Sequence, residues 1–247
     1  MDRLIYTAVT GMNASMARQR MIANNMANAQ TTGFRAETMQ FTPMTLKGPS
    51  LEARAMSNAE MRGVQMDPGA LIQTGRSLDI AVNGEAMLTM QAEDGSEAYT
   101  RRGDLSVSPT GVLVGGDGLP VIGQSGAISV PLGAEISIAP DGSVLVRDKA
   151  SPDTPPQTID KVKLVSSRGT RIEKALDGLF RVFGGGVLPA DDAARIQPGA
   201  LEQSNVKSAQ VLVEMVEAQR LFEMRTKLIA TARELDEGGA NLMRMNA

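Results

Sequence analysis

The sequence predicts an α+β fold, in which a central antiparallel all-β domain is flanked by N- and C-terminal heptad-bearing α-helices that pack together. Three observations lead to this prediction. Both ends of the chain carry apolar residues at helical spacing, and the middle carries short apolar runs separated by turn sequences. The 247 residues, 42% of them hydrophobic, are also enough to bury a core.

The first helix is predicted from apolar positions that alternate at spacings of three and four, which is a heptad seam. The positions of this seam are Ile5, Ala8, Met12, Ser15, Gln19, Ile22 and Met26. Because two of them are polar, the seam alone buries little apolar surface. We therefore expect this helix, within residues 1–30, to need partners.

The end of this helix is rich in asparagine. Asn24, Asn25 and Asn28 lie just before a turn-forming segment. Asparagine is a poor residue for a helix interior, but it caps helix ends and tolerates positive φ. One or two of the three are explained as caps. The remainder indicate either a specified turn or a surface made to be contacted.

The next region, residues 31–77, carries scattered glycine and proline residues and is predicted to be an extended arm or connector. Residues 78–187 then form the predicted β domain, and residues 188–205 a return connector. Nine short runs within the β domain have the composition of strands. They are residues 80–82, 87–90, 98–101, 105–107, 112–114, 121–122, 135–138, 144–147 and 162–165.

Asp94, Asp117 and Asp141 each precede a glycine. A calcium or catalytic role is conceivable for such carboxylates, but Asp-Gly between strands is far more often a turn. We therefore predict hairpin turns at these positions.

The last helix is predicted over residues 206–247. One stripe contains Leu212, Met215, Gln219, Phe222 and Ile229, and leucines at strict sevens lie beside it, at positions 221, 228, 235 and 242. Two adjacent stripes exceed what a single partner helix requires. A coil formed within one chain and packing between chains both stay open. Ser204 and Asn205, just before this helix, are typical N-cap residues.

The composition excludes most familiar activities. The chain has 25 basic and 28 acidic residues, which gives no attraction to nucleic acid, and it has no histidine or cysteine for catalysis or metal binding. An enzyme would need a carboxylate pair such as Glu85 with Asp104, which nothing else supports. We predict no catalytic residue, no metal and no cofactor. No segment is apolar enough to span a membrane, and no cleaved signal peptide is recognisable.

Four segments, in order along the chain, resemble the motifs of the flagellar rod and hook protein family. They are Asn24-Asn25-Met26-Ala27-Asn28 with Thr31-Thr32-Gly33-Phe34; Leu78-Asp79-Ile80-Ala81-Val82-Asn83-Gly84 with Asp94-Gly95, Tyr99-Thr100-Arg101-Arg102-Gly103 and Thr110-Gly111-Val112-Leu113-Val114; Leu201-Glu202-Gln203-Ser204-Asn205-Val206; and Glu214-Met215-Val216 with Gln219-Arg220 and Phe222-Glu223. Within the family, residues 1–8 and 133–142 resemble the proximal rod proteins, and the distal rod proteins share the same motifs.

The resemblance implies a structural subunit of the bacterial flagellar rod, assembled through its terminal helices and transmitting torque from motor to hook. It implies export through the flagellar type III apparatus, a place in the periplasmic rod, and contacts with other rod proteins and copies of the same chain. No nucleic acid or direct membrane insertion is expected. The alternatives are a distal rod or hook-family subunit, or a β-domain binding module with helical oligomerisation ends.

The same resemblance assigns assembly roles to the motif residues. These are Asn24, Asn25, Asn28, Thr32, Gly33, Phe34, Ser204, Asn205, Val206, Gln219, Arg220 and Phe222. In this interpretation the asparagines cap the helix and bind neighbouring backbone, and so fix the direction in which the chain leaves it. Gly33 makes the turn out of the helix layer, and Phe34 anchors that turn. Local capping without an intermolecular role stays open. For the pair Arg101-Arg102 we expect a solvated hairpin end.

Overall fold

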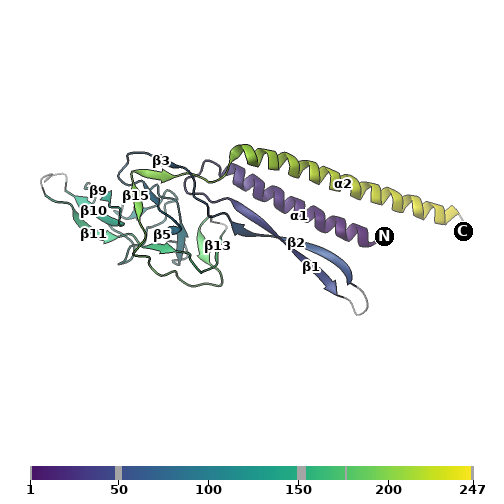
Figure 1. The fold of residues 1–247 in the computed structure, drawn as a ribbon, viewed down its shortest axis with the longest axis horizontal. Coiled ribbons are helices and arrows are strands. Elements are labelled where there is room, and N and C mark those ends of the chain that lie inside the picture. The colour runs from purple at the N-terminus through teal and green to yellow at the C-terminus, as the bar shows by residue number, and fades with distance from the viewer. Residues whose placement is uncertain (1, 48–51, 149–153, 176, 246–247) are drawn as a thin grey trace. The chain divides into compact units, whose positions relative to one another are not determined.

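The computed structural model describes residues 2–47, 52–148, 154–175 and 177–245 (Figure 1). The chain divides into two compact units. The helical unit consists of Met1–Asn28, Glu37–Gln65 and Val206–Ala247, and the β unit of Ala29–Ala36 and Met66–Asn205. The chain therefore passes from one unit to the other four times, after residues 28, 36, 65 and 205.

The helical unit combines two helices with a β-hairpin. Its helices are α1 (Asp2–Ala27) and α2 (Ser208–Met245), and its hairpin is formed by β1 (Glu37–Lys47) and β2 (Glu52–Val64). Figure 1 shows α1 and α2 side by side. The prediction that the two terminal helices pack together in an α+β fold is confirmed.

The polar positions of the α1 seam face α2. Ser15 is buried, and its Oγ accepts a hydrogen bond from Nη1 of Arg225, which also donates to the carbonyl oxygen of Gly11. Nε2 of Gln19 donates to the carbonyl oxygen of Ala218 at 3.5 Å. The seam therefore adds directional hydrogen bonds between the helices to its limited apolar burial.

The face of α2 that packs on α1 differs in part from the predicted stripe, of which Met215, Phe222 and Ile229 are half-buried. Val211 and Ala218 are buried, whereas Leu212 and Gln219 are exposed. The heptad pattern fits both registers, and tertiary packing selects the one that places small Ala218 against α1. The seam positions Ile5 and Ala8 and the leucines at 235 and 242 lie outside the residues whose side chains are described.

The β unit is built from short strands around one main core. They are β3 (Leu71–Gln73), β4 (Ile80–Val82), β5 (Ala86–Gln91), β6 (Glu97–Thr100), β7 (Ser106–Val107), β8 (Leu113–Val114), β9 (Glu135–Ile138), β10 (Ser143–Arg147), β11 (Gln157–Lys161), β12 (Leu164–Ser166), β13 (Ile172–Lys174), β14 (Phe180–Val182), β15 (Ile196–Pro198) and β16 (Ala200–Glu202). The largest sheet has the order β12-β5-β6-β14-β13, with every pair antiparallel.

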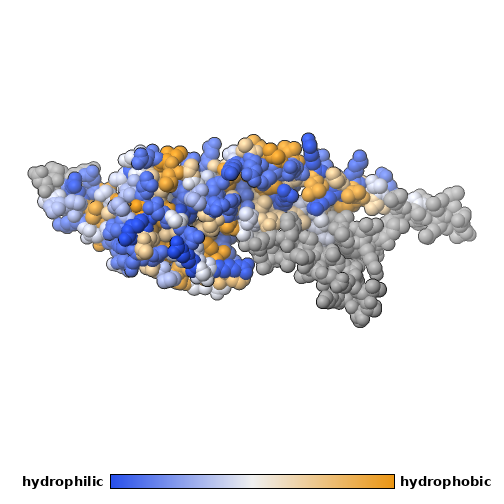
Figure 2. Space-filling view, in the orientation of Figure 1, coloured by the Kyte–Doolittle hydropathy of each residue, from blue (hydrophilic) through white to orange (hydrophobic). Residues whose placement is uncertain are grey.

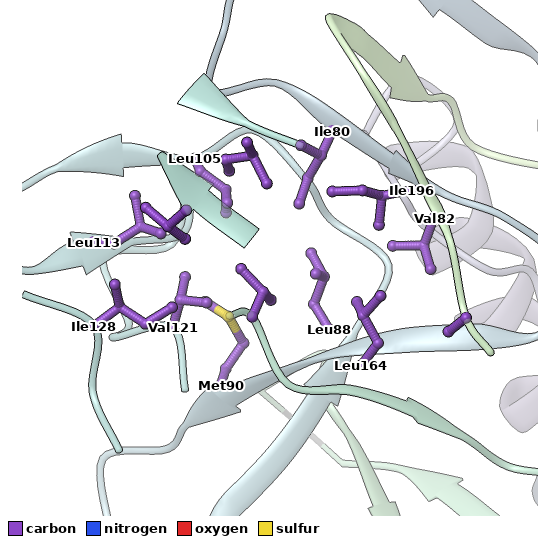
Figure 3. Close-up of a cluster of buried hydrophobic side chains, with 14 of the residues drawn as sticks. Ile80, Val82, Leu88, Met90, Leu105, Leu113, Val121, Ile128, Leu164 and Ile196 are labelled. Carbon is purple, nitrogen blue, oxygen red and sulfur yellow. The ribbon is translucent and has the colours of Figure 1, made fainter. Parts of the chain in front are cut away.

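The core of the β unit lies among these small sheets (Figure 3). Ile80, Leu88, Leu105 and Leu113 point towards one another there, and each is fully buried. Strands of two to six residues form little sheet on their own, so this shared apolar core is what holds them together.

Several strands coincide with the predicted runs, and β4 and β9 have the predicted bounds. The sequence-based prediction missed the β1–β2 hairpin, β3, β11 and β13–β16. Strands such as β13, with the sequence Ile-Glu-Lys, and β15 carry few consecutive apolar residues, so their burial pattern was not visible in the sequence.

The predicted Asp-Gly turns are present. Asp94, Asp141 and the additional Asp177 each accept a hydrogen bond from the backbone N–H two residues later, at 2.9, 3.2 and 3.0 Å. The following glycines have φ of +82°, +90° and +82°, a region that L side chains rarely adopt. These carboxylates therefore fix turns.

We expect these three turns to make the β unit sensitive to acid. Hydrogen bonds from Ser96, Ser143 and Arg181 lower the pKa of Asp94, Asp141 and Asp177 respectively. A lowered pKa in the folded state means stability that is fully present above the unfolded value, about 4, and is lost as the pH falls through the folded value.

Urea unfolding between neutral pH and pH ~3 measures this effect. The triple variant D94N/D141N/D177N should lose less free energy of unfolding on acidification than the wild type, because asparagine keeps the turn acceptor without titrating. Equal acid losses in the two proteins would contradict the assignment.

Candidate functional site

The asparagines at the end of α1 bind the start of β1 within the helical unit. Oδ1 of Asn25 accepts from N–H of Glu37 at 2.8 Å, and its Nδ2 donates to the carbonyl oxygen of Glu37 at 2.9 Å. Nδ2 of Asn24 donates to Oε1 of the same residue at 2.7 Å. The Asn25 amide thus pairs with both backbone groups of one residue, as a neighbouring strand would.

Asn28 acts locally. Its Nδ2 donates to the carbonyl oxygen and to Oδ1 of Asn24, both at 2.9 Å, and so binds an oxygen at the end of the helix. The predicted hydrogen bonds from these asparagines to backbone groups are present at Asn25 and Asn28. The expected tolerance of positive φ is not used, because every described residue with positive φ is a glycine.

Replacing Asn25 by alanine should loosen the entry into β1. The side chain of Asn25 is buried, so its loss leaves the Glu37 backbone groups without these partners, at a cost of about 1–3 kcal/mol. Hydrogen–deuterium exchange at the Glu37 amide should accelerate, whereas N13A, at an exposed position of α1, should leave it unchanged. Unchanged exchange in both variants would contradict the role given to Asn25.

In the β unit, the turn predicted at Gly33 is present, with φ +67°. N–H of Gly33 donates to the carbonyl oxygen of Glu202 at 2.7 Å, and a Cβ at this position would lie 2.5 Å from the backbone of Arg101. Phe34 is buried, and Nζ of Lys174 lies 3.6 Å from its ring centroid. Gly33 therefore permits a backbone approach as well as the turn.

Glu202 lies at the centre of a buried ion cluster. Its Oε1 accepts from Nη2 of Arg35 at 2.6 Å and from N–H of Gly69 at 2.9 Å. Its Oε2 accepts from Nε of Arg101 at 2.8 Å and lies 2.7 Å from Nη2 of the same residue. These four residues, the Glu202 cluster, come from four segments that are far apart in the sequence.

The cluster carries two guanidinium groups against one carboxylate, all of them fully buried. Burial lowers the pKa of Arg101 and nearby Arg35 lowers it further, whereas Glu202 opposes the shift. Arg101 also donates to the carbonyl oxygens of Val82, Gly84 and Ala86 at 2.6–2.7 Å. Nε and Nη1 of Arg35 have no hydrogen-bond partner in the described protein, so this arginine depends on Glu202.

Asn205 forms a second set of hydrogen bonds between separate segments of the β unit. Its Oδ1 accepts from N–H of Ala36 at 2.7 Å, its Nδ2 donates to the carbonyl oxygen of Asp67 at 2.9 Å, and its N–H donates to the carbonyl oxygen of Phe34 at 3.3 Å. Helix α2 begins only at Ser208, so the N-cap interpretation of Ser204 and Asn205 was wrong. Together, Asn205 and the Glu202 cluster hold three segments of the β unit at the points where the chain enters or leaves it, near residues 36, 66 and 205.

One further prediction needs correction. Arg101 is 1% exposed and forms no solvated hairpin end; Arg102, half-buried, pairs with Asp104 at 2.7 Å. Glu85 forms an exposed ion pair with Arg168. The suggested carboxylate pair of Glu85 and Asp104 is therefore engaged in separate ion pairs. Sequence reasoning also gave no role to Arg35, Gly69 or Glu202. A charged residue at a strand end carries no signal of burial, and Gly69 takes part only through its backbone N–H.

The outward side of α2 is apolar in places. Gln219 and Arg220 are exposed, and Phe222 is half-buried, so the structure does not bring these three motif residues together at one point. Five exposed apolar residues, the outer α2 set, project from the helix: Leu212, Val213, Val216, Met224 and Leu228. Figure 2 shows apolar side chains on the surface over α2.

Comparison with known proteins decides what kind of chain carries these features. Three families match in order: "Flagella basal body rod protein" over residues 5–35, "Flagellar hook protein FlgE/F/G D1 domain" over 81–146 and "Flagellar basal body rod FlgEFG protein C-terminal" over 197–242. The flagellar basal-body rod protein FlgF of Salmonella typhimurium is 40% identical over 98% of both chains. The chain belongs to the flagellar basal-body rod protein family.

Other members of the rod protein family are also similar over nearly the whole chain. FlgF of Escherichia coli is 38% identical over 98% of both chains, and FlgG of Bacillus subtilis is 31% identical over 99% of this chain and all of its own length. The family assignment, FlgF-like, is thereby confirmed, and with it a structural rod subunit in place of an enzyme.

The Glu202 cluster takes one arginine or glutamate from each of the three matched segments of the rod family. Arg35 ends the first segment, Arg101 lies in the second and Glu202 in the third. Side chains from three motifs that are separate in the sequence therefore meet in one buried cluster. Among the described residues, no helix is long and apolar enough to cross a membrane.

Proposed function

We propose that this rod-family chain assembles through its terminal helices with other rod proteins and with copies of itself, and transmits torque from motor to hook as part of the proximal rod. The single observation that supports this most is the outer α2 set. Val211 and Ala218 are already covered within the chain, whereas Val213, Met224 and Leu228 are 59–63% exposed.

Fully burying a Val, Leu or Met side chain contributes about 1.5–3 kcal/mol. Five such side chains on one exposed helix are therefore a substantial source of binding energy, and groups of this kind mark interaction sites. We infer that another subunit's helix is the partner, because exposed charges lie between the apolar residues, as they do in helix–helix contacts. Glu217, Arg220 and Lys227 would then pair between chains and set their register.

The location follows from the same proposal. A place in the proximal, periplasmic rod is supported by the similarity to proteins named FlgF, and the similarity to proteins named FlgG keeps a distal rod subunit as the alternative. We infer export through the flagellar type III apparatus without a cleaved signal peptide. The absence of cysteine suits a chain that is exported before it folds.

Isolated basal bodies test the proposal. The epitope-tagged chain, expressed in a strain that lacks its own copy, should restore swimming and be found by immunoelectron microscopy on the rod below the distal segment. Label confined to the distal rod would overturn the proximal assignment. Restored swimming with no label on basal bodies would overturn the structural role.

A further inference from the structure

The β unit exposes an asparagine–glycine pair, Asn83-Gly84, next to a backbone carbonyl that binds Arg101 of the Glu202 cluster. We propose that Asn83 is a site of spontaneous deamidation and isoaspartate formation, and that this modification disrupts the hydrogen bond between Arg101 and the carbonyl oxygen of Gly84. Asn83-Gly84 is the only Asn-Gly pair in the 247-residue sequence. It lies in the exposed turn between β4 and β5.

The reaction needs only the chain and water. The backbone nitrogen of Gly84, on losing its proton, attacks Cγ of Asn83; the new C–N bond closes a five-membered imide as the side-chain nitrogen leaves as ammonia. Water then opens either imide carbonyl and gives aspartate or isoaspartate. A following glycine favours this attack because no Cβ crowds the nitrogen and its backbone is the most adaptable.

The local structure leaves the reacting groups free. No described hydrogen bond engages the side-chain amide of Asn83 or the N–H of Gly84, and nothing lies within 4 Å of the place where a Cβ of Gly84 would be. Three other asparagines with described side chains differ in this respect. Those of Asn25 and Asn205 are held at both atoms, and Asn13, although exposed, lies within α1 and precedes Ala14.

The carbonyl oxygen of Gly84 connects the reaction at Asn83 to the buried Glu202 cluster. Arg101 donates from Nη1 to the carbonyl oxygen of Gly84 at 2.7 Å, and the same guanidinium binds Glu202. Isoaspartate inserts a methylene into the main chain directly before Gly84 and adds a negative charge. The carbonyl oxygen of Gly84 is then displaced, and Arg101 loses one of its three backbone acceptors.

Ageing the purified full-length chain at mildly alkaline pH tests the proposal. Peptide mapping, with isoaspartyl methyltransferase labelling of the products, gives the modification rate at each asparagine. We expect Asn83 to react at least about tenfold faster than Asn13, which corresponds to a barrier lower by about 1.4 kcal/mol. The urea midpoint of the β unit should fall as the Asn83 product accumulates, and N83Q should age without that fall.

Two results would overturn the proposal. Equal modification rates at Asn83 and Asn13, compared within the same wild-type sample, would show that Asn83 is not a preferred site of deamidation. Extensive isoaspartate at Asn83 with an unchanged urea midpoint would show that the modification does not weaken the hydrogen bonding of Arg101. Neither result depends on whether the chain assembles into a rod.

Discussion

Replacing Glu202 by glutamine should destabilise the β unit by about 3–5 kcal/mol, the cost of leaving a buried charge without its partner. Both arginines of the Glu202 cluster lose their carboxylate, and Arg35 retains no other described hydrogen-bond partner for its guanidinium nitrogens. The loss of unfolding free energy should exceed that of an ordinary surface substitution, because water cannot reach the guanidinium groups of Arg35 and Arg101 once their carboxylate partner is gone.

Tyrosine fluorescence during urea unfolding measures this loss, since the chain has no tryptophan and only two tyrosines. In a Y6F background the signal comes from Tyr99, which is fully buried in the β unit. E85Q is the matched control: its exposed ion pair with Arg168 is worth about 0–1 kcal/mol. Similar losses for E202Q and E85Q would show that the cluster does not stabilise the β unit.

Placing lysines at Met224 and Leu228 should reduce incorporation into basal bodies at least about tenfold, because burying an unpaired charge at a helix–helix contact is costly. The two residues lie one helical turn apart and are 61% and 63% exposed in the single chain, so the variant M224K/L228K should keep its fold. Circular dichroism checks that its helix content is unchanged.

Thr226 provides the control within the same helix. It lies between the two positions along the chain but is rotated from each by roughly 200° at 3.6 residues per turn. T226K should therefore reach basal bodies at wild-type levels. Normal incorporation of M224K/L228K would exclude Met224 and Leu228 as contact residues of the outer α2 set.

Much of the architecture was predictable because it depends on periodicity and turn chemistry. Heptad spacing indicated α1 and α2, and Asp-Gly steps marked turns such as those at Asp94 and Asp141. The choice between Leu212 and Val211 as the inner position of α2 was not predictable, because it depends on how closely the backbone of α1 approaches.

The candidate site was predictable only in part. The motif asparagines were recognised, but the partners of Asn25 and Asn205 are backbone groups, which every residue possesses and no sequence pattern distinguishes. Arg101 was misjudged, since an arginine is almost never fully buried unless it is paired. Its partner Glu202 lies a hundred residues away, and only the fold brings them together.

A photoreactive amino acid at position 228 tests the central claim, that the outer side of α2 contacts another subunit. After irradiation of motile cells and isolation of basal bodies, mass spectrometry identifies the cross-linked peptides, with position 226 as the control. We predict that position 228 captures a terminal-helix peptide of another rod protein or of a second copy of this chain. Basal bodies that contain the chain, but in which position 228 forms only intrachain cross-links, would contradict the account.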